Sequence, residues 1–299
     1  MGSSRATNRS RLAQALLRSL AGIVGLAVLW LVTVFLVSEW RLRREHFAPL
    51  VPLAAGTPDP VEGRRMARIL GCWAGCHGME GQGGAEELEG IVRVTAPTLS
   101  EVLPHYSDAQ LVRLIRYGVK RDGHSALGMT SYTFWPISDA DLADVIAHLR
   151  AQPASPPVPR ERHITLAGRF ALAVGRWKTS ADAVDRAMPR WGELPRTTPY
   201  ERGRYLASIV CSECHGLDFR GDPLNGGPSL AIMSIYSIEQ FRHLLRTGEP
   251  IGGRDLGIMS WVARNAFVDF TDPEIADIHA FLTEFHGGAR TQQATDAAN

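Results

Sequence analysis

The chain has few cysteines and no excess of either charge. Its 299 residues include four cysteines, which are too few for the disulfide framework of a small secreted protein. The 32 lysine and arginine residues balance 31 aspartate and glutamate residues, so no basic surface favours nucleic acid as a partner. The sequence also lacks a phosphate-binding loop, a Ser-His-Asp pattern and a paired-carboxylate motif, and therefore gives no sign of those classes of active site.

One long uncharged run is present near the N-terminus. Residues 20–37 contain only Thr33 as a polar side chain. As a helix with a rise of ~1.5 Å per residue, the run would extend roughly 27 Å, close to the thickness of the hydrocarbon core of a bilayer. A signal peptide has a shorter apolar region and a cleavage site that the sequence after Val37 lacks; a buried core helix is the other alternative. We therefore expect a transmembrane anchor over residues 20–37, within an N-terminal segment 1–45.

Proline-rich stretches divide the rest of the chain. The composition of residues 46–59 is typical of a tether, and the proline-rich residues 153–159 follow a helical pattern and indicate the end of a folded unit. The predicted parts after the tether are a domain at residues 60–152, a linker at 153–198, a second domain at 199–287 and a tail at 288–299.

The predicted linker contains an apolar segment. Residues 164–174 are compatible with a helix that carries Arg169, and Arg176 and Lys178 follow it. Such a segment packs against the domains, or it forms a surface contact with lipid or with a partner subunit. The sequence does not choose between these alternatives.

The two predicted domains are related by an internal repeat. A shift of 130 residues (236 − 106) aligns residues 106–129 with residues 236–259, and eight of the 24 positions are identical, where chance at ~6% per position would give one or two. The identical pairs include Ser107/Ser237, Arg116/Arg246, Gly118/Gly248 and Met129/Met259. Helices are expected at residues 108–117, 139–150, 238–247 and 272–284. Because strand signals are scarce, the predicted fold is all-α: a transmembrane helix followed by two tandem helical domains.

Each unit contains a cysteine pair followed by a histidine. Cys211-Ser-Glu-Cys214-His215 matches Cys-x-x-Cys-His, the attachment signature of c-type haem. Two thiols one helical turn apart can each form a thioether with a haem vinyl group, while the next residue presents an imidazole to the iron. A zinc site would need further Cys or His pairs, and a thioredoxin-like site would need a βαβ setting.

The first unit carries a wider version of this motif. Cys72 and Cys76 are separated by three residues and are followed by His77. Residues three and four apart lie on the same face of a helix, so both spacings keep the two sulfur atoms together. The place of this motif in a duplicated unit favours a second haem site, and the extra residue within 73–75 leaves attachment through both thiols open.

The chain resembles a membrane-anchored dihaem cytochrome c built from two class I cytochrome c domains. The resemblance covers about residues 60–287, and it depends on the two motifs, on the loops that begin at Pro97 and Pro228, and on a methionine before the last helix of each unit. It implies two covalently attached c-type haems. The implied iron ligands are His77 and His215 on one side and Met129 and Met259 on the other, with the carbonyls of Pro97 and Pro228 accepting the histidine Nδ1 hydrogens.

The distal ligands also have alternatives in the sequence. Met79 is too close to the motif histidine to reach the other side of a haem, and no methionine besides Met129 and Met259 has a methionine at the repeat offset. His124 is the alternative to Met129, although its repeat partner is Arg254. For Met259 the alternative is a methionine that only fills the core.

The resemblance implies electron transfer rather than enzymatic activity, because His/Met ligation fills both axial positions and raises the reduction potential. We expect a relay between redox partners such as a dehydrogenase, a quinol-oxidising complex or a terminal oxidase. A haem enzyme with one displaceable ligand, such as a dihaem peroxidase or a sulfur-compound dehydrogenase, is the alternative. Since c-type haem is attached outside the bacterial cytoplasmic membrane, residues 38–299 are expected on the periplasmic side of the inner membrane, with the N-terminus in the cytoplasm.

Overall fold

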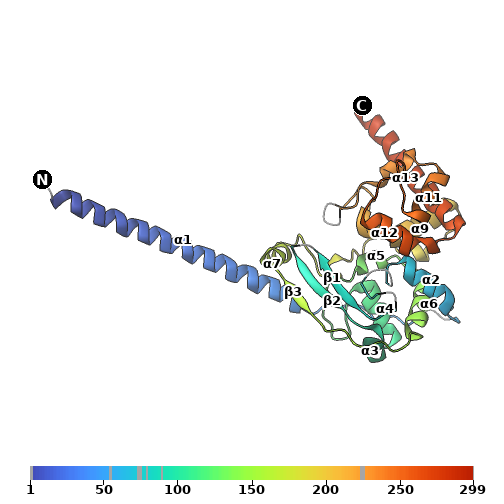
Figure 1. Ribbon diagram of the computed structural model, residues 1–299, viewed down its shortest axis with the longest axis horizontal. Coiled ribbons are helices and arrows are strands. Elements are labelled where there is room, and N and C mark those ends of the chain that lie inside the picture. The colour runs from blue at the N-terminus through green and yellow to red at the C-terminus, as the bar shows by residue number, and fades with distance from the viewer. Residues whose placement is uncertain are drawn as a thin grey trace.

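The computed structural model describes residues 3–53, 56–72, 76–78, 80–88, 90–222 and 226–298. It is mostly helical, with 56% helix and 7% strand. A single long helix, α1 (Ser3–Arg43), projects from a body that contains the rest of the chain (Figure 1). Its portion Gln14–Arg43 is long and apolar enough to cross a membrane, as expected for the run at residues 20–37.

The body consists of two helical halves and a connection. The first half contains α2 (Pro60–Ile69), α3 (Leu99–Val102), η1 (Leu103–His105), α4 (Asp108–Tyr117), α5 (Ser131–Phe134) and α6 (Asp139–Arg150). The connection contains α7 (Leu166–Ala173), α8 (Ser180–Ala183) and η2 (Trp191–Glu193). The second half contains α9 (Pro199–Val210), α10 (Ser212–His215), η3 (Leu230–Ile235), α11 (Ile238–Thr247), α12 (Ile258–Asn265), η4 (Phe267–Asp269) and α13 (Asp272–Ala298). The four helices expected from the sequence are confirmed, and the last extends further than expected.

Identical repeat positions begin and end α4 and α11. Ser107 and Ser237 form capping boxes, each with the glutamine three residues later, so that side chains satisfy the first free backbone N–H groups. Gly118 and Gly248 end the same two helices with φ values of 69° and 76°, in the left-handed region that glycine adopts without strain. The repeat in the sequence therefore produces the same helix twice.

In each half the first and last helices pack tightly against each other. Helix α2 packs on α6, and α9 packs on α13. The contact points are Gly63 and Gly203, where an added Cβ would overlap the backbone carbonyl of Asp144 or Asp277, respectively. Only glycine allows the two backbones to approach this closely.

An arginine at an identical repeat position makes stabilising contacts in each half. Arg116 is buried, donates to the carbonyl of Ile137 at 2.9 Å and pairs with Asp139 at 2.8 Å. At the equivalent place in the second half, Arg246 pairs with Asp272 at 3.0 Å. In both halves the bond partner is the aspartate that opens the last helix, where a negative charge also interacts favourably with the helix dipole.

The prediction of an all-α fold is wrong for one region. Strands β1 (Gly84–Leu88), β2 (Val92–Ala96) and β3 (Arg162–Ile164) form an antiparallel sheet in the order β1-β2-β3. The sheet was hard to predict because β1 is rich in glycine, alanine and glutamate, which are depleted in strands. In addition, β3 belongs to the connection and begins 66 residues after the end of β2 (162 − 96). The β1–β2 hairpin also explains why residues 77–97 form a longer loop than its counterpart in the second half.

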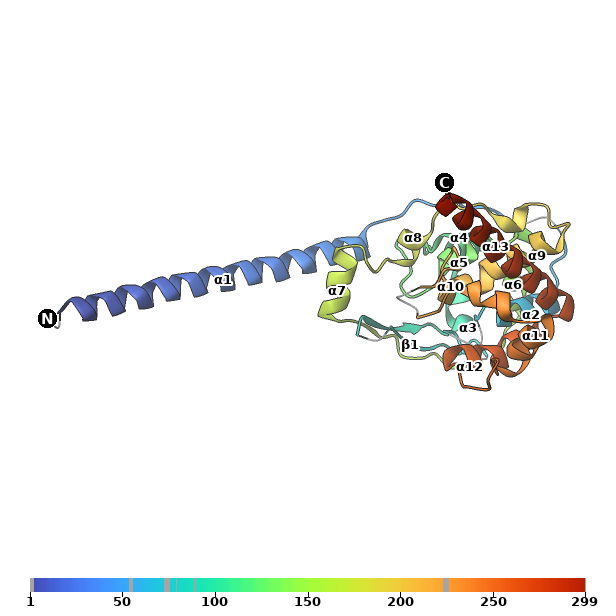
Figure 2. The same ribbon diagram turned by 90° about the horizontal axis from the view of Figure 1, so that it is seen from above.

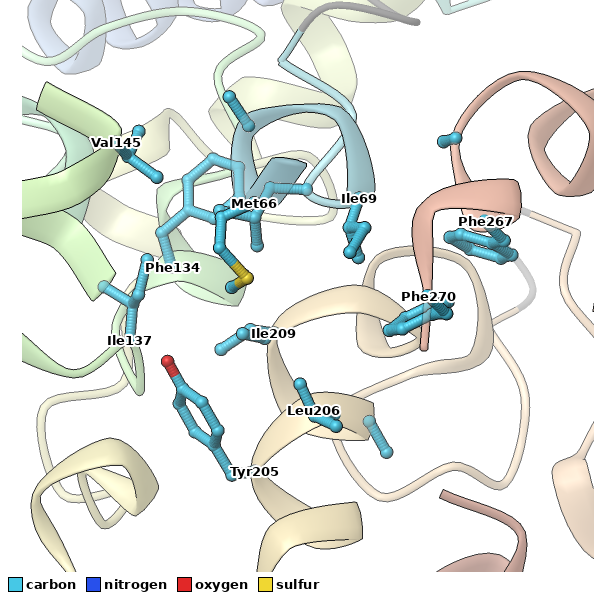
Figure 3. Packing of buried hydrophobic residues seen from close by; sticks show 14 of the residues in the cluster. Met66, Ile69, Phe134, Ile137, Val145, Tyr205, Leu206, Ile209, Phe267 and Phe270 are labelled. Atoms are coloured by element: carbon cyan, nitrogen blue, oxygen red, sulfur yellow. The ribbon is translucent and has the colours of Figure 1, made fainter. Parts of the chain in front are cut away.

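The two halves share one hydrophobic core. Met66 and Ile69 from α2 belong to the same buried cluster as Tyr205 and Ile209 from α9. Figure 3 shows these side chains pointing into the space between the two helices, with Phe270 of the second half beside them. The halves are therefore packed together rather than joined only by a linker.

Polar contacts also join the halves. The hydroxyl of the buried Tyr205 donates to the carboxylate of Asp141 and accepts a hydrogen bond from the backbone N–H of Ser138 at 3.2 Å. Arg65 of α2 pairs with Glu274 of α13 at 2.8 Å. Because buried polar atoms need partners, these bonds fix the orientation of one half on the other.

The segment after α1 is packed on the body. The backbone N–H of His46 donates to the carbonyl of Gly123 at 2.8 Å. Ala48 is buried in a small cluster with Tyr117 and Trp135. The described part of the predicted tether thus holds the end of α1 against the first half.

Candidate functional site

The motif of the second half lies where α9 ends. Cys211 caps α9, and the short helix α10 carries Cys214 and His215. Nδ1 of His215 lies 2.7 Å from the carbonyl oxygen of Pro228. Since a carbonyl only accepts, this contact requires the hydrogen on Nδ1 and leaves Nε2 with its lone pair available as a ligand.

The motif of the first half has the same arrangement around its histidine. Nδ1 of His77 lies 3.0 Å from the carbonyl oxygen of Pro97, so Nε2 is again the available nitrogen. These are the two hydrogen bonds that the resemblance implies. The extra residue of the motif, within 73–75, and Met79 lie outside the described residues.

Burial favours the neutral form of both histidines. It lowers the pKa of His77 and of His215 from the ordinary value, and the hydrogen bonds to Pro97 and Pro228 only partly oppose this effect. A neutral imidazole with a fixed tautomer is the form that binds a metal ion. Both rings are therefore prepared for coordination through Nε2.

No disulfide bond joins any of the four cysteines, all of which lie in the described part of the chain. Burial raises the pKa of Cys72 and of Cys211 to about 12, and the pKa of Cys214 to about 11. Thiol–disulfide catalysts have the opposite property, because their reactive thiols have pKa values well below the ordinary one. Among the described residues, no group of three or more His, Cys, Asp and Glu side chains could hold a metal ion by itself.

Both candidate methionines are partly buried against the shared core. Met129 lies just before α5, and Ser131 of that helix donates to the carbonyl of Leu114 at 3.1 Å. Met259 lies in the first turn of α12, where Ser260 donates to the carbonyl of Gly248 at 2.5 Å. Each methionine is thus positioned by a serine hydroxyl that is bonded to the repeated helix, α4 or α11.

The alternative ligand, His124, faces another part of the molecule. Its Nδ1 lies 3.5 Å from Asp122, and its backbone pairs with Glu45 in an isolated β-bridge. This places His124 where the segment after α1 is packed on the body.

The two motifs are close to each other in space. The carboxylate of Glu213, inside the second motif, acts electrostatically on the thiol of Cys72 in the first. Ile69 and Ile209, which precede the motifs, are both buried in the shared core (Figure 3), and Cys72 and Cys211 pack against that core. Sequence reasoning missed this proximity, because it depends on how two distant segments pack.

No protein-family model matches the chain, and no curated protein shows a significant match to it. The site is therefore interpreted from its own residues. In each half, thiols, an imidazole nitrogen with its hydrogen-bonded partner, and a thioether come from the ends of helices and from the loops between them. This donor set fits a c-type haem, which needs vinyl-reactive thiols and axial nitrogen and sulfur ligands.

Proposed function

We propose that the protein is a membrane-anchored dihaem cytochrome c that relays electrons. The observation that best supports the proposal is the pair of His–Pro hydrogen bonds, 3.0 Å at Pro97 and 2.7 Å at Pro228. Each histidine directly follows a cysteine pair. In both halves the first and last helices also cross closely at a glycine. One such contact has many structural explanations, but the same contact at both motifs favours a common role for the histidines.

The chain would hold one haem in each half. Cys72, Cys76 and His77 would bind the first, and Cys211, Cys214 and His215 the second, with Met129 and Met259 as the distal ligands. When bound, each haem supplies one-electron iron chemistry. The Pro97 and Pro228 carbonyls keep each imidazole in one tautomer and orientation, which makes the nitrogen a more basic ligand.

Burial is the second contribution of the protein. The thiols, the histidines and the methionines are partly buried, and a site of low polarity would oppose charge build-up on a bound metal. If His and Met both stay bound in each half, the centre would exchange electrons without binding a substrate.

The proximity of the motifs supports passage of electrons within one chain. Cys72 is close enough to Glu213 for the carboxylate to act on the thiol, and the segments before both motifs belong to one core. Helix α1 would anchor this body to the inner membrane, and the segment packed after it would keep the haem centres near the periplasmic surface. Electron donors and acceptors are expected among membrane or periplasmic redox proteins.

Mass spectrometry after expression with a c-type cytochrome maturation system tests the proposal. We expect the intact chain to gain about 1.2 kDa, the mass of two haems. The Cys211→Ser/Cys214→Ser variant should gain half as much, and Ser212→Ala is the control that leaves both motifs intact. A chain without covalent haem would refute the proposal, and an oxidised form without the near-infrared band of methionine ligation would favour the haem-enzyme alternative.

A further inference from the structure

Helix α7 carries an apolar stripe that nothing in the body covers. Leu166, Phe170 and Val174 follow at intervals of four residues, which places them on one side of the helix, and they are 55%, 40% and 51% exposed. On the other side, Gly168 and Leu172 are buried. A helix that buries one face and exposes apolar side chains on the other has a second partner.

Helix α7 packs against the end of α1 that joins the body, and Figure 2 shows that it runs across α1 rather than along it. Arg169 pairs with Glu39 at 2.8 Å, donates to Ser38 at 3.0 Å and lies over the ring of Phe35. If α1 crosses a bilayer, a helix in this orientation lies parallel to the membrane plane.

The aromatic contact between α7 and α1 indicates how deep α7 would lie in the membrane. The ring of Phe170 lies 5.7 Å from that of Trp30, centroid to centroid. Trp30 precedes the end of the uncharged run at Val37 by seven residues, or ~10 Å along the helix axis. Helices that lie in the lipid–water interface bury their apolar face roughly 5–10 Å below the headgroup boundary, which agrees with a stripe that meets α1 inside this run.

Basic side chains lie on the side where lipid headgroups would be. Arg176 and Lys178 follow α7 and are exposed. The guanidinium of Arg41 approaches the turn at Gly175, where an added Cβ would lie 3.6 Å from it. Cations next to an apolar stripe are the pattern that binds anionic lipid.

We propose that α7 is a second membrane contact, lying in the outer lipid–water interface with Leu166, Phe170 and Val174 among the acyl chains. The inference rests on the membrane anchoring proposed for α1. Lipid is the occupant because the stripe continues the apolar surface of α1 at the same depth. Two crossed contacts fix the tilt of the body on the membrane, whereas a single helix would leave it free to swing.

Photolabelling of the full chain tests this contact. The protein is reconstituted in vesicles of phosphatidylcholine and phosphatidylglycerol that contain a lipid with a diazirine in its acyl chain, and tryptic peptides are analysed after illumination. We expect label in α1 and in the peptide of residues 170–176. The peptide of residues 255–264, which carries the exposed Ile258 and Trp261, serves as the internal control and should stay unlabelled.

Variants separate the two membrane contacts. Phe170→Asp/Val174→Asp should reduce labelling of residues 170–176 at least about fivefold while α1 stays labelled, because a carboxylate avoids the acyl region. Val61→Asp changes an apolar residue on α2 that is even more exposed, at 77%, and should leave the pattern as it is; circular dichroism checks that both variants fold. Label in α1 without label in residues 170–176 would overturn the inference. The stripe would then be covered by a protein partner or by a second copy of the chain, and not by lipid. Absence of label from both would instead refute the membrane anchoring.

Discussion

Substitution of Gly203 by alanine gives the sharpest test of the helix crossing. In an open helix this change stabilises by up to ~1 kcal/mol, because alanine has the higher helix propensity. Here the new methyl group would overlap the carbonyl of Asp277 and lie 2.8 Å from Cβ of Phe281. A backbone carbonyl cannot rotate away, so the overpacking cost lies at or above the upper end of the usual ~1–3 kcal/mol. We expect a net loss of about 2 kcal/mol in the free energy of unfolding, measured by urea denaturation of the full chain.

Two matched substitutions accompany Gly203→Ala. Gly63→Ala places a methyl group against the carbonyl of Asp144 in the first half and should cost a similar amount. Gly25→Ala in α1 meets no atom within 4 Å and should leave the unfolding of the body unchanged. If Gly203→Ala were as stable as the parent protein, the close crossing of α9 and α13 would be wrong.

Three further changes probe other parts of the structure. Tyr205→Phe removes a buried hydroxyl between the halves and should cost about 1–3 kcal/mol in a thermal melt; an unchanged melting temperature would argue against the shared interface. Although burial raises the pKa of Asp139, its bonds to Arg190 and Arg116 hold that pKa below the ordinary value. The unfolded state therefore takes up the proton first, so this contribution is complete at neutral pH and is lost as the pH falls below about 4. With Asp139→Asn, the free energy of unfolding should depend less on pH in acid. An unchanged pH dependence in acid would contradict this role. Ala48→Asp puts a charge into a buried cluster and should speed proteolysis of the segment after α1; equal cleavage rates would show that the segment is not held there.

Local signals made the helices predictable. Ser107 and Ser237 begin their helices by capping, and Gly118 and Gly248 end theirs, so the bounds of α4 and α11 followed from residues within one turn. The motif histidines were also visible as a pattern. Their contacts with the two prolines were expected only through the resemblance, since no spacing rule brings a loop carbonyl to a ring nitrogen.

Long-range packing made the rest unpredictable. Strand β3 pairs with a strand 66 residues earlier in the chain, and nothing within either strand indicates its partner. In the same way, nothing near Glu213 in the sequence indicates that it acts on Cys72, and nothing near Ala48 indicates the cluster in which it is buried. A duplicated sequence suggested two separate domains, and the structure shows that their hydrophobic faces are completed by each other.

The shared core makes the stability of each half depend on the other. Cys72 and Cys211 are partly buried against a core to which both halves contribute. Met66 and Ile69 of α2 belong to a cluster that contains residues of both halves, so the packing around them is complete only when α9 is in place. A substitution that loosens the packing of either half should therefore destabilise the other half as well, and the two halves should unfold together.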